Sequence, residues 1–142
     1  MKIFVDTSVL IEYIKGTKTE LLEKLIINKY SLYISTIVYS EFMFHFISVT
    51  TGKSPFTIKK KKEIKNILET YEPIKFLELF EILPETKQGT ELSYLFMKKH
   101  NLLPNDSLIL ETCKAYNLDA LASYDSDFKE IAEKENIKLL TE

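Results

Sequence analysis

The sequence contains no arginine, and all 19 of its basic residues are lysines. A phosphate site in this chain therefore cannot use the planar guanidinium group, which binds phosphate through two parallel hydrogen bonds. The formal net charge is −2, which disfavours a broadly basic surface for nucleic acid. Any contact with a polyanion must be local or must be carried by bound metal ions.

Cysteine and glycine are also scarce. The single cysteine, Cys113, excludes an internal disulfide and a cysteine-rich zinc site, and its apolar neighbours indicate a core position in a helix. The three glycines are isolated at positions 16, 52 and 89. P-loop and dinucleotide-binding enzymes need glycine-rich turns, so both classes are excluded.

Long apolar runs are missing as well. The longest are far shorter than the roughly 20 residues that a membrane span needs. The N-terminal stretch carries Asp6 and Glu12 and has no small-residue cleavage site, so it does not resemble a signal peptide. We expect a soluble, cytoplasmic protein without a membrane partner, and its 142 residues suit one domain over 1–142.

The apolar pattern alternates between two periods along the chain. Short apolar runs predict strands at 2–5, 30–34, 118–122 and 137–140. Helical spacing predicts helices at 7–15, 20–28, 36 to at least 46, 56–70, 85–100, 104–116 and 128–135. Residues 50–55 are expected to form a loop, and 76–83 a helix followed by a short strand. This order predicts an α/β fold with a mainly parallel central sheet flanked by helices.

The few aspartates occupy particular positions in this pattern. There are five, at 6, 106, 119, 125 and 127. Asp6 and Asp125 each follow a predicted strand, so both should lie at the edge formed by the carboxyl ends of the strands. Asp106 falls in the first turn of a predicted helix. The placement predicts a metal site at this edge.

Carboxylates at such an edge suit one kind of chemistry. Mg²⁺ and Mn²⁺ prefer oxygen ligands, and ions held by carboxylates can activate water and stabilise the leaving oxygen of a phosphodiester. Any single aspartate at a strand end or in a first helical turn more often caps a helix or shapes a turn. Four of the five aspartates in such positions nevertheless favour a shared site.

Four segments carry these acids and one glutamate in order along the chain. They are IFVDTSVLIE at 3–12, ISTIVYSEF at 34–42, PNDSLIL at 104–110 and LASYDSDF at 121–128. Together they resemble the four motifs of the PIN-domain family, over nearly the whole chain. Asp6, Glu41, Asp106 and Asp125 match the family's acidic positions, and Ser123 stands where the family often has threonine.

The resemblance implies a three-layer α/β/α fold and an Mg²⁺- or Mn²⁺-dependent endoribonuclease. It implies Asp6, Asp106 and Asp125 as metal ligands and Glu41 as a further catalytic residue. The short single-domain form is similar to VapC-type toxins, which implies an RNA substrate, a cognate antitoxin partner and a homodimer. Two alternatives stay open: a PIN nuclease of RNA processing or decay, and a non-catalytic RNA-binding or scaffolding module. Such modules often lose acidic positions that are all filled here.

Other polar residues have weaker claims to a role. A phosphatase of the haloacid-dehalogenase type needs a carboxylate two positions after the first aspartate, where this chain has Ser8. Asp127 is expected to cap the helix that follows it, although it competes with Asp125 as the fourth acid. Tyr124 is suited either to stacking on a base or to packing over the sheet edge. The lysines around 59–62 are interpreted as a solvated helix face.

The two histidines of the chain are predicted to play no part in a metal site. His45 and His100 have no partner at metal-ligand spacing, and both are interpreted as surface or partly buried helix residues.

Overall fold

A five-stranded parallel sheet forms the centre of the protein, which a computed structural model describes over residues 1–142. The strands are β1 (Lys2–Val5), β2 (Ser31–Ser35), β3 (Glu81–Leu83), β4 (Ala120–Ala122) and β5 (Lys138–Leu140). Their order across the sheet is β3-β2-β1-β4-β5, and every neighbouring pair is parallel. The predicted parallel sheet is confirmed.

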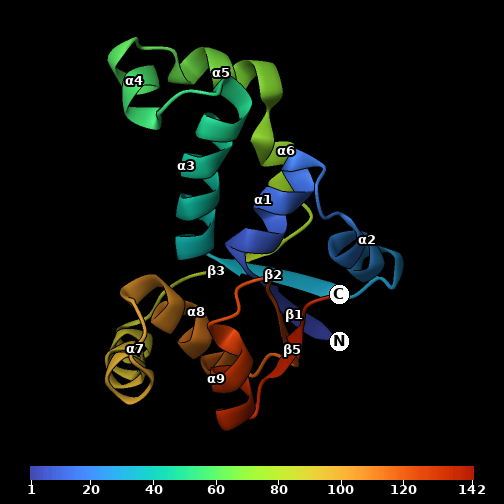
Figure 1. Ribbon diagram of the computed structural model, residues 1–142, viewed down its shortest axis with the longest axis vertical. Coiled ribbons are helices and arrows are strands. Elements are labelled where there is room, and N and C mark those ends of the chain that lie inside the picture. The colour runs from blue at the N-terminus through green and yellow to red at the C-terminus, as the bar shows by residue number, and fades with distance from the viewer.

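Helices cover both faces of this sheet and complete the three layers. They are α1 (Thr7–Lys15), α2 (Glu20–Ile27), α3 (Thr36–Thr51), α4 (Pro55–Lys60), α5 (Ile64–Tyr71), α6 (Pro73–Leu77), α7 (Lys87–His100), α8 (Pro104–Ala115) and α9 (Phe128–Lys134). Figure 1 shows α1 and α3 on one face of the sheet and α7, α8 and α9 on the other, with α4 and α5 at the far end of α3.

The order in which strands are added to the sheet reverses between β1 and β4, which is the topological switch point of the fold. From β1 the chain moves outward through β2 to β3, and it then returns to β4 on the other side of β1. The backbone N–H of Asp6 donates to the carbonyl of Ala122 over 2.9 Å, so the ends of the two strands are level. Ligands of open parallel sheets bind beyond the carboxyl ends of the strands at such a switch point.

Burial on both faces of the sheet explains the apolar sequences of the central strands. Ile3, Phe4 and Val5 are all fully buried, because helices cover both faces of the sheet around them. They belong to a core of 25 buried apolar residues that also includes Cys113, as predicted. A buried core of this kind fixes β1 and β4 and therefore the residues that follow them.

The lysine-rich region departs from the prediction of one helix over 56–70. The structure has two helices there, and Lys62 between them adopts a φ of 58°. Ile47, Ile58 and Ile67 form a separate small cluster, which the break allows to close. Helix α3 also extends through Thr51 into the predicted loop. The short strand predicted before Pro84 agrees with β3, but the helix before it begins earlier than predicted, because Pro73 opens α6 at its first position.

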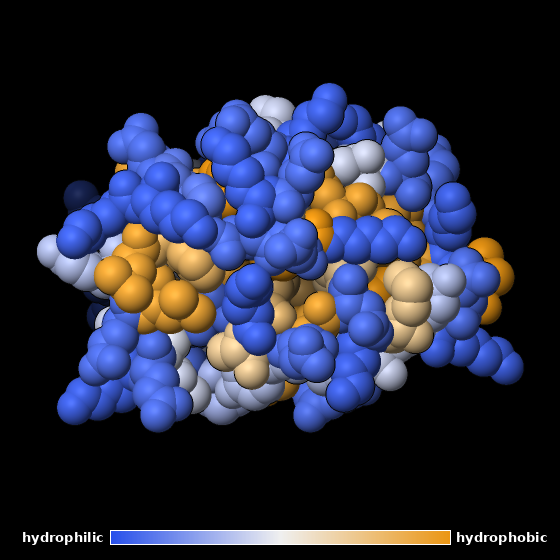
Figure 2. All heavy atoms as spheres, turned by 90° about the horizontal axis from the view of Figure 1, so that it is seen from below, coloured by the Kyte–Doolittle hydropathy of each residue, from blue (hydrophilic) through white to orange (hydrophobic).

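None of the helices combines the length and the apolar character that a membrane-spanning helix requires. Figure 2 shows hydrophilic side chains over most of the face seen from below, with apolar atoms showing between them in patches.

Candidate metal centre

Asp6 directly follows β1 and begins α1, as the sequence predicts. It occupies the N-cap position, but its side chain makes no capping hydrogen bond. Instead, Asp6 Oδ2 accepts hydrogen bonds from the hydroxyls of Ser8 and Ser123, both over 2.7 Å. Asp6 is only 5% exposed, and this burial raises the pKa of its carboxyl against the opposing effect of the two hydroxyls. The chain thus holds Asp6 in one fixed orientation.

Glu41 reaches the same region from α3. Ser35 caps this helix by accepting a hydrogen bond from the backbone of Val38, which places Glu41 on its second turn. Both carboxylate oxygens are held, because Oε1 accepts from Thr7 Oγ1 at 2.9 Å and Oε2 accepts from Asn105 Nδ2 at 3.3 Å. Glu41 therefore links α1 to the start of α8.

Asp106 lies in the first turn of α8, behind Pro104 at the first helical position. The pKa of its carboxyl is raised from 3.8 to about 6, first by burial and then by the negative charges of Asp125, Asp6 and Glu41. A carboxyl that is difficult to ionise among other carboxylates is stabilised in its charged form when a cation binds.

Asp125 shapes the turn after β4 as well as facing the other acids. Its Oδ1 accepts a hydrogen bond from the backbone N–H of Asp127 over 2.9 Å, and its own N–H donates to Ser123 Oγ over 3.0 Å. Asp127 occupies the N-cap position of α9 but makes no side-chain capping hydrogen bond. The prediction that Asp127 caps this helix is therefore wrong.

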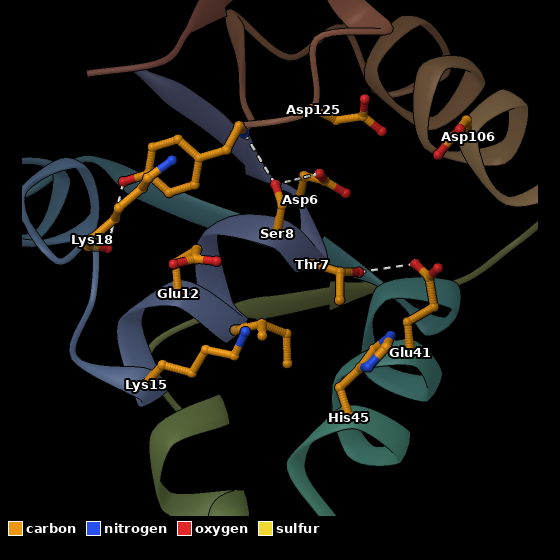
Figure 3. A pocket seen from close by; sticks show the side chains of 12 residues that line it. Asp6, Thr7, Ser8, Glu12, Lys15, Lys18, Glu41, His45, Asp106 and Asp125 are labelled. Carbon is orange, nitrogen blue, oxygen red and sulfur yellow. Dashed lines mark hydrogen bonds between the residues drawn. The ribbon is translucent and has the colours of Figure 1, made fainter. Parts of the chain in front are cut away.

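The predicted acids line one open cavity of about 560 Å³ (Figure 3). Asp6, Glu41, Asp106 and Asp125 all border it, although they come from four separate segments. One carboxylate oxygen each from Asp106, Asp125 and the exposed Asp127 lie within 4.8 Å of one another. This tight group includes Asp127 and not Asp6, so the structure adds a fifth acid to the four expected from the sequence.

The donor set fits a hard divalent cation. All the candidate ligand atoms are carboxylate oxygens, and no cysteine or histidine belongs to the group. Oxygen-only sets of this kind suit Mg²⁺, Mn²⁺ or Ca²⁺ rather than metals that prefer nitrogen or sulfur. Burial, and after it the negative charges of the neighbouring acids, raise the pKa of Asp106, so a bound cation would favour its ionised form.

Comparison with known families identifies the fold. The family model described as "PIN domain" matches residues 3–134. The chain belongs to the PIN-domain family. This match spans all the acids of the centre, so the resemblance drawn from the four sequence segments is confirmed.

Two curated relatives of this PIN domain come from Methanocaldococcus jannaschii. Ribonuclease VapC2 is 36% identical over 92% of this chain and 89% of its own length. Ribonuclease VapC6 is 32% identical over 96% of each chain.

Solved structures share the fold at lower identity. A Mycobacterium tuberculosis VapC20 structure, titled as a sarcin-ricin loop cleaving toxin, has a TM-score of 0.66 at 15% identity over 91% of this chain and 94% of that one. A toxin-antitoxin complex from Klebsiella pneumoniae has a TM-score of 0.65 at 19% identity, covering 98% and 96%.

Several residues around the cavity of this PIN domain were not singled out as site residues from the sequence. Glu12, Lys15 and Lys18 line the wall formed by α1 and the turn after it, and His45 lines the wall formed by α3. Their spacing could have predicted a place beside the acids. Ser8, Glu12 and Lys15 recur on one helical face, and His45 lies four residues after Glu41, on the same face of its helix. His45 is exposed, as expected, and it is not part of the acidic group.

His100 lies far from these acids along the sequence and has a structural partner. Its side chain is only 3% exposed, and Nε2 lies 2.7 Å from Glu135 Oε1, which also accepts from Lys99. The contact ties the end of α7 to the segment before β5. The sequence predicted a surface or partly buried helix residue, and the ring is more deeply buried than that.

Proposed function

We propose that this PIN domain is a metal-dependent endoribonuclease that hydrolyses phosphodiester bonds in single-stranded RNA regions. The observation that carries the proposal is the convergence of Asp6, Glu41, Asp106 and Asp125 on one cavity from four segments. Two relatives at 36% and 32% identity carry the name ribonuclease, which supports the same activity. RNA as substrate also agrees with a cytoplasmic location.

The cation expected at the acids is Mg²⁺ or Mn²⁺, with Asp6, Asp106 and Asp125 as ligands. A bound divalent ion lowers the pKa of water and offsets charge on the phosphate oxygens. The protein's part is to keep the acids in place, and the two hydroxyl donors to Asp6 do this at one wall. Glu41, oriented by Thr7 and Asn105, supplies a carboxylate that can accept a hydrogen bond from the attacking water.

The names of the relatives also support a role as the toxin of a toxin–antitoxin pair. Both curated relatives are VapC proteins, and the Klebsiella pneumoniae structure is titled a toxin-antitoxin complex. We therefore propose a cognate antitoxin as protein partner and a homodimer as the assembly. The toxin role predicts a small reading frame beside this one, and co-purification of its product with this chain would test that prediction.

A cleavage assay tests the enzymatic proposal directly. The purified chain should cut single-stranded RNA in Mg²⁺ or Mn²⁺ and should lose this activity in excess EDTA. Asp6→Asn should remove most activity, because the amide cannot supply the charge that holds the ion. Glu91→Gln, on the exposed face of α7, makes the same chemical change away from the cavity and should keep full activity. Cleavage that persists in EDTA, or a fully active Asp6→Asn protein, contradicts the proposal.

A further inference from the structure

Lys18 and Tyr124 form a close pair beside the acidic centre. Lys18 Nζ lies 5.0 Å from the centroid of the Tyr124 ring, and the Tyr124 hydroxyl donates to the Lys18 carbonyl at 3.5 Å. The backbone N–H of Tyr124 donates to Ser8 Oγ over 3.0 Å, and the same Ser8 hydroxyl donates to Asp6. The position of the ring is therefore tied to the residues that hold the metal-binding edge.

The two lysines of this wall carry charge that no acid of the protein pairs with. Neither Lys15 nor Lys18 is in an ion pair, and both are exposed. Glu12 precedes both lysines along the chain, and its carboxylate accepts a hydrogen bond from the Thr17 hydroxyl. Figure 3 shows both lysines on the side of the cavity away from Asp106. An extended polyanion that reaches the acids therefore meets two ammonium groups on this side that no carboxylate pairs with.

Tyr124 borders more than the cavity of the acids. Two further cavities, of about 470 Å³ and 420 Å³, also have Tyr124 in their walls. Lys24 lines the first of them together with Lys18, and Lys129 lines the second together with Asp125. The ring thus lies where three hollows meet, each with at least one lysine in its wall.

We propose that Tyr124 and Lys18, with Lys15, form a subsite for the nucleotide next to the phosphodiester that is cut. The base stacks on the Tyr124 ring in the place of the Lys18 ammonium, and Lys18 and Lys15 bind neighbouring phosphates. This proposal rests on the proposed ribonuclease function. Stacking of a base on an aromatic ring is stronger than an exposed cation–π contact, so this exchange favours binding. Because the bases of a duplex are already stacked, the subsite selects single-stranded RNA.

The alternative is that Tyr124 only packs over the sheet edge and Lys18 is only solvated. Tyr124→Leu removes the ring, Tyr124→Phe keeps it, and Lys18→Ala removes one charge. Lys60→Ala, on the exposed surface of α4, is the matched control for the loss of a lysine. The probe is a short fluorescein-labelled single-stranded RNA of mixed sequence. Its affinity is measured by fluorescence anisotropy in EDTA over a series of salt concentrations.

We expect Tyr124→Leu to weaken binding of the single strand about tenfold, with Tyr124→Phe close to the parent. Lys18→Ala should weaken binding and lower the slope of log affinity against log salt by about 0.7, with no change for Lys60→Ala. A duplex of the same sequence should bind Tyr124→Leu and the parent alike. Equal affinity of the parent, Tyr124→Leu and Lys18→Ala for the single strand overturns the subsite.

Cleavage with Mg²⁺ or Mn²⁺ separates this proposal from the proposed function. If both hold, KM should rise in Tyr124→Leu and Lys18→Ala while kcat changes less. A parent that cuts RNA with the same KM as these variants keeps the ribonuclease and overturns the subsite. A parent that binds RNA through Tyr124 but never cuts it keeps the subsite and overturns the ribonuclease.

Discussion

The Ser123 hydroxyl donates a hydrogen bond to Asp6 Oδ2 over 2.7 Å and so joins the carboxyl ends of β4 and β1. Ser123 is fully buried and Asp6 nearly so. Burial disfavours the charged form of a carboxyl, whereas a donor to its oxygen favours it. Ser123 thus helps Asp6 to stay both ionised and oriented toward the cavity.

Replacing Ser123 by alanine should therefore lower stability and activity together. Loss of a hydrogen bond to a buried charged group costs about 1–3 kcal/mol of unfolding free energy. Urea unfolding of the parent, Ser123→Ala, Asp6→Asn and the double variant measures this cost. In the Asp6→Asn background the cost should be smaller, because the bond then has a neutral acceptor. The same cost in both backgrounds indicates that Ser123 acts through packing alone.

Asp125 and Asp127 should respond differently to substitution. Asp125→Asn and Asp125→Ala both remove the charge and should both lose most cleavage activity. Only Asn keeps the oxygen that accepts from the Asp127 N–H, so Asp125→Ala should be less stable than Asp125→Asn by about 1 kcal/mol. Asp127→Asn should leave stability unchanged and weaken metal binding, because its exposed carboxylate makes no capping bond. Thermal melts in EDTA and Mn²⁺ titrations measure both effects, and a marked loss of stability in Asp127→Asn contradicts this assignment.

The sequence was sufficient for the acids that the backbone places directly. Asp6 and Asp125 follow apolar strands, and parallel strands bring their carboxyl ends to one edge, so their convergence could be predicted. Asp106 was a candidate through its place in a first helical turn, whereas Glu41 depended on the family resemblance, because a single glutamate inside a helix has no distinctive pattern.

Two features depended on tertiary packing and could not be predicted. The apolar spacing through 56–70 continues across Lys62. The positive φ of Lys62 accompanies the packing of Ile58 and Ile67 against Ile47, which the sequence does not show.

An aspartate just before a helix is typical of both a helix cap and a metal ligand. Asp127 does not cap because its backbone is helical, with φ −63° and ψ −26°, whereas capping residues are usually extended.

The raised pKa of Asp106 predicts that metal binding weakens in acid. The carboxyl holds its proton up to about pH 6 in the metal-free protein, and a cation must displace that proton. Apparent affinity for Mn²⁺ should therefore be steady above this pH and should fall up to about tenfold per pH unit below it. Calorimetric titration across this range measures the change. Asp106→Asn should bind more weakly throughout and lose much of this pH dependence, whereas an unchanged dependence places the proton on another acid.

A second acidic pair lies away from the cavity, where α7 packs on α8. Glu111 of α8 is 2% exposed and contacts Glu85, whose two carboxyl oxygens are buried with no other hydrogen-bond partner. A Cβ on Gly89 of α7 would lie 2.6 Å from both Glu111 oxygens, so the glycine allows the carboxyl to fit there. Burial and the hydrogen bond with Glu85 raise the pKa of Glu111 from 4.5 to about 7. One proton shared by the two carboxyls would give the Glu85 oxygens the hydrogen-bond partner that they otherwise lack.

This shared proton makes the stability of the protein depend on pH in a defined direction. Between pH 4.5 and about 7 the folded chain keeps a proton that the unfolded chain has released, so the unfolding free energy of the parent falls as pH rises through this window. Glu111→Gln removes the ionisation and leaves an amide N–H that can donate to Glu85. The variant should match the parent near pH 5 and exceed it near pH 8, on the order of 1 kcal/mol, in denaturant unfolding. Glu91→Gln on the exposed face of α7 is the control and should follow the parent at both pH values. If Glu111→Gln and the parent lose stability in parallel across the window, the proton is not shared at this pair.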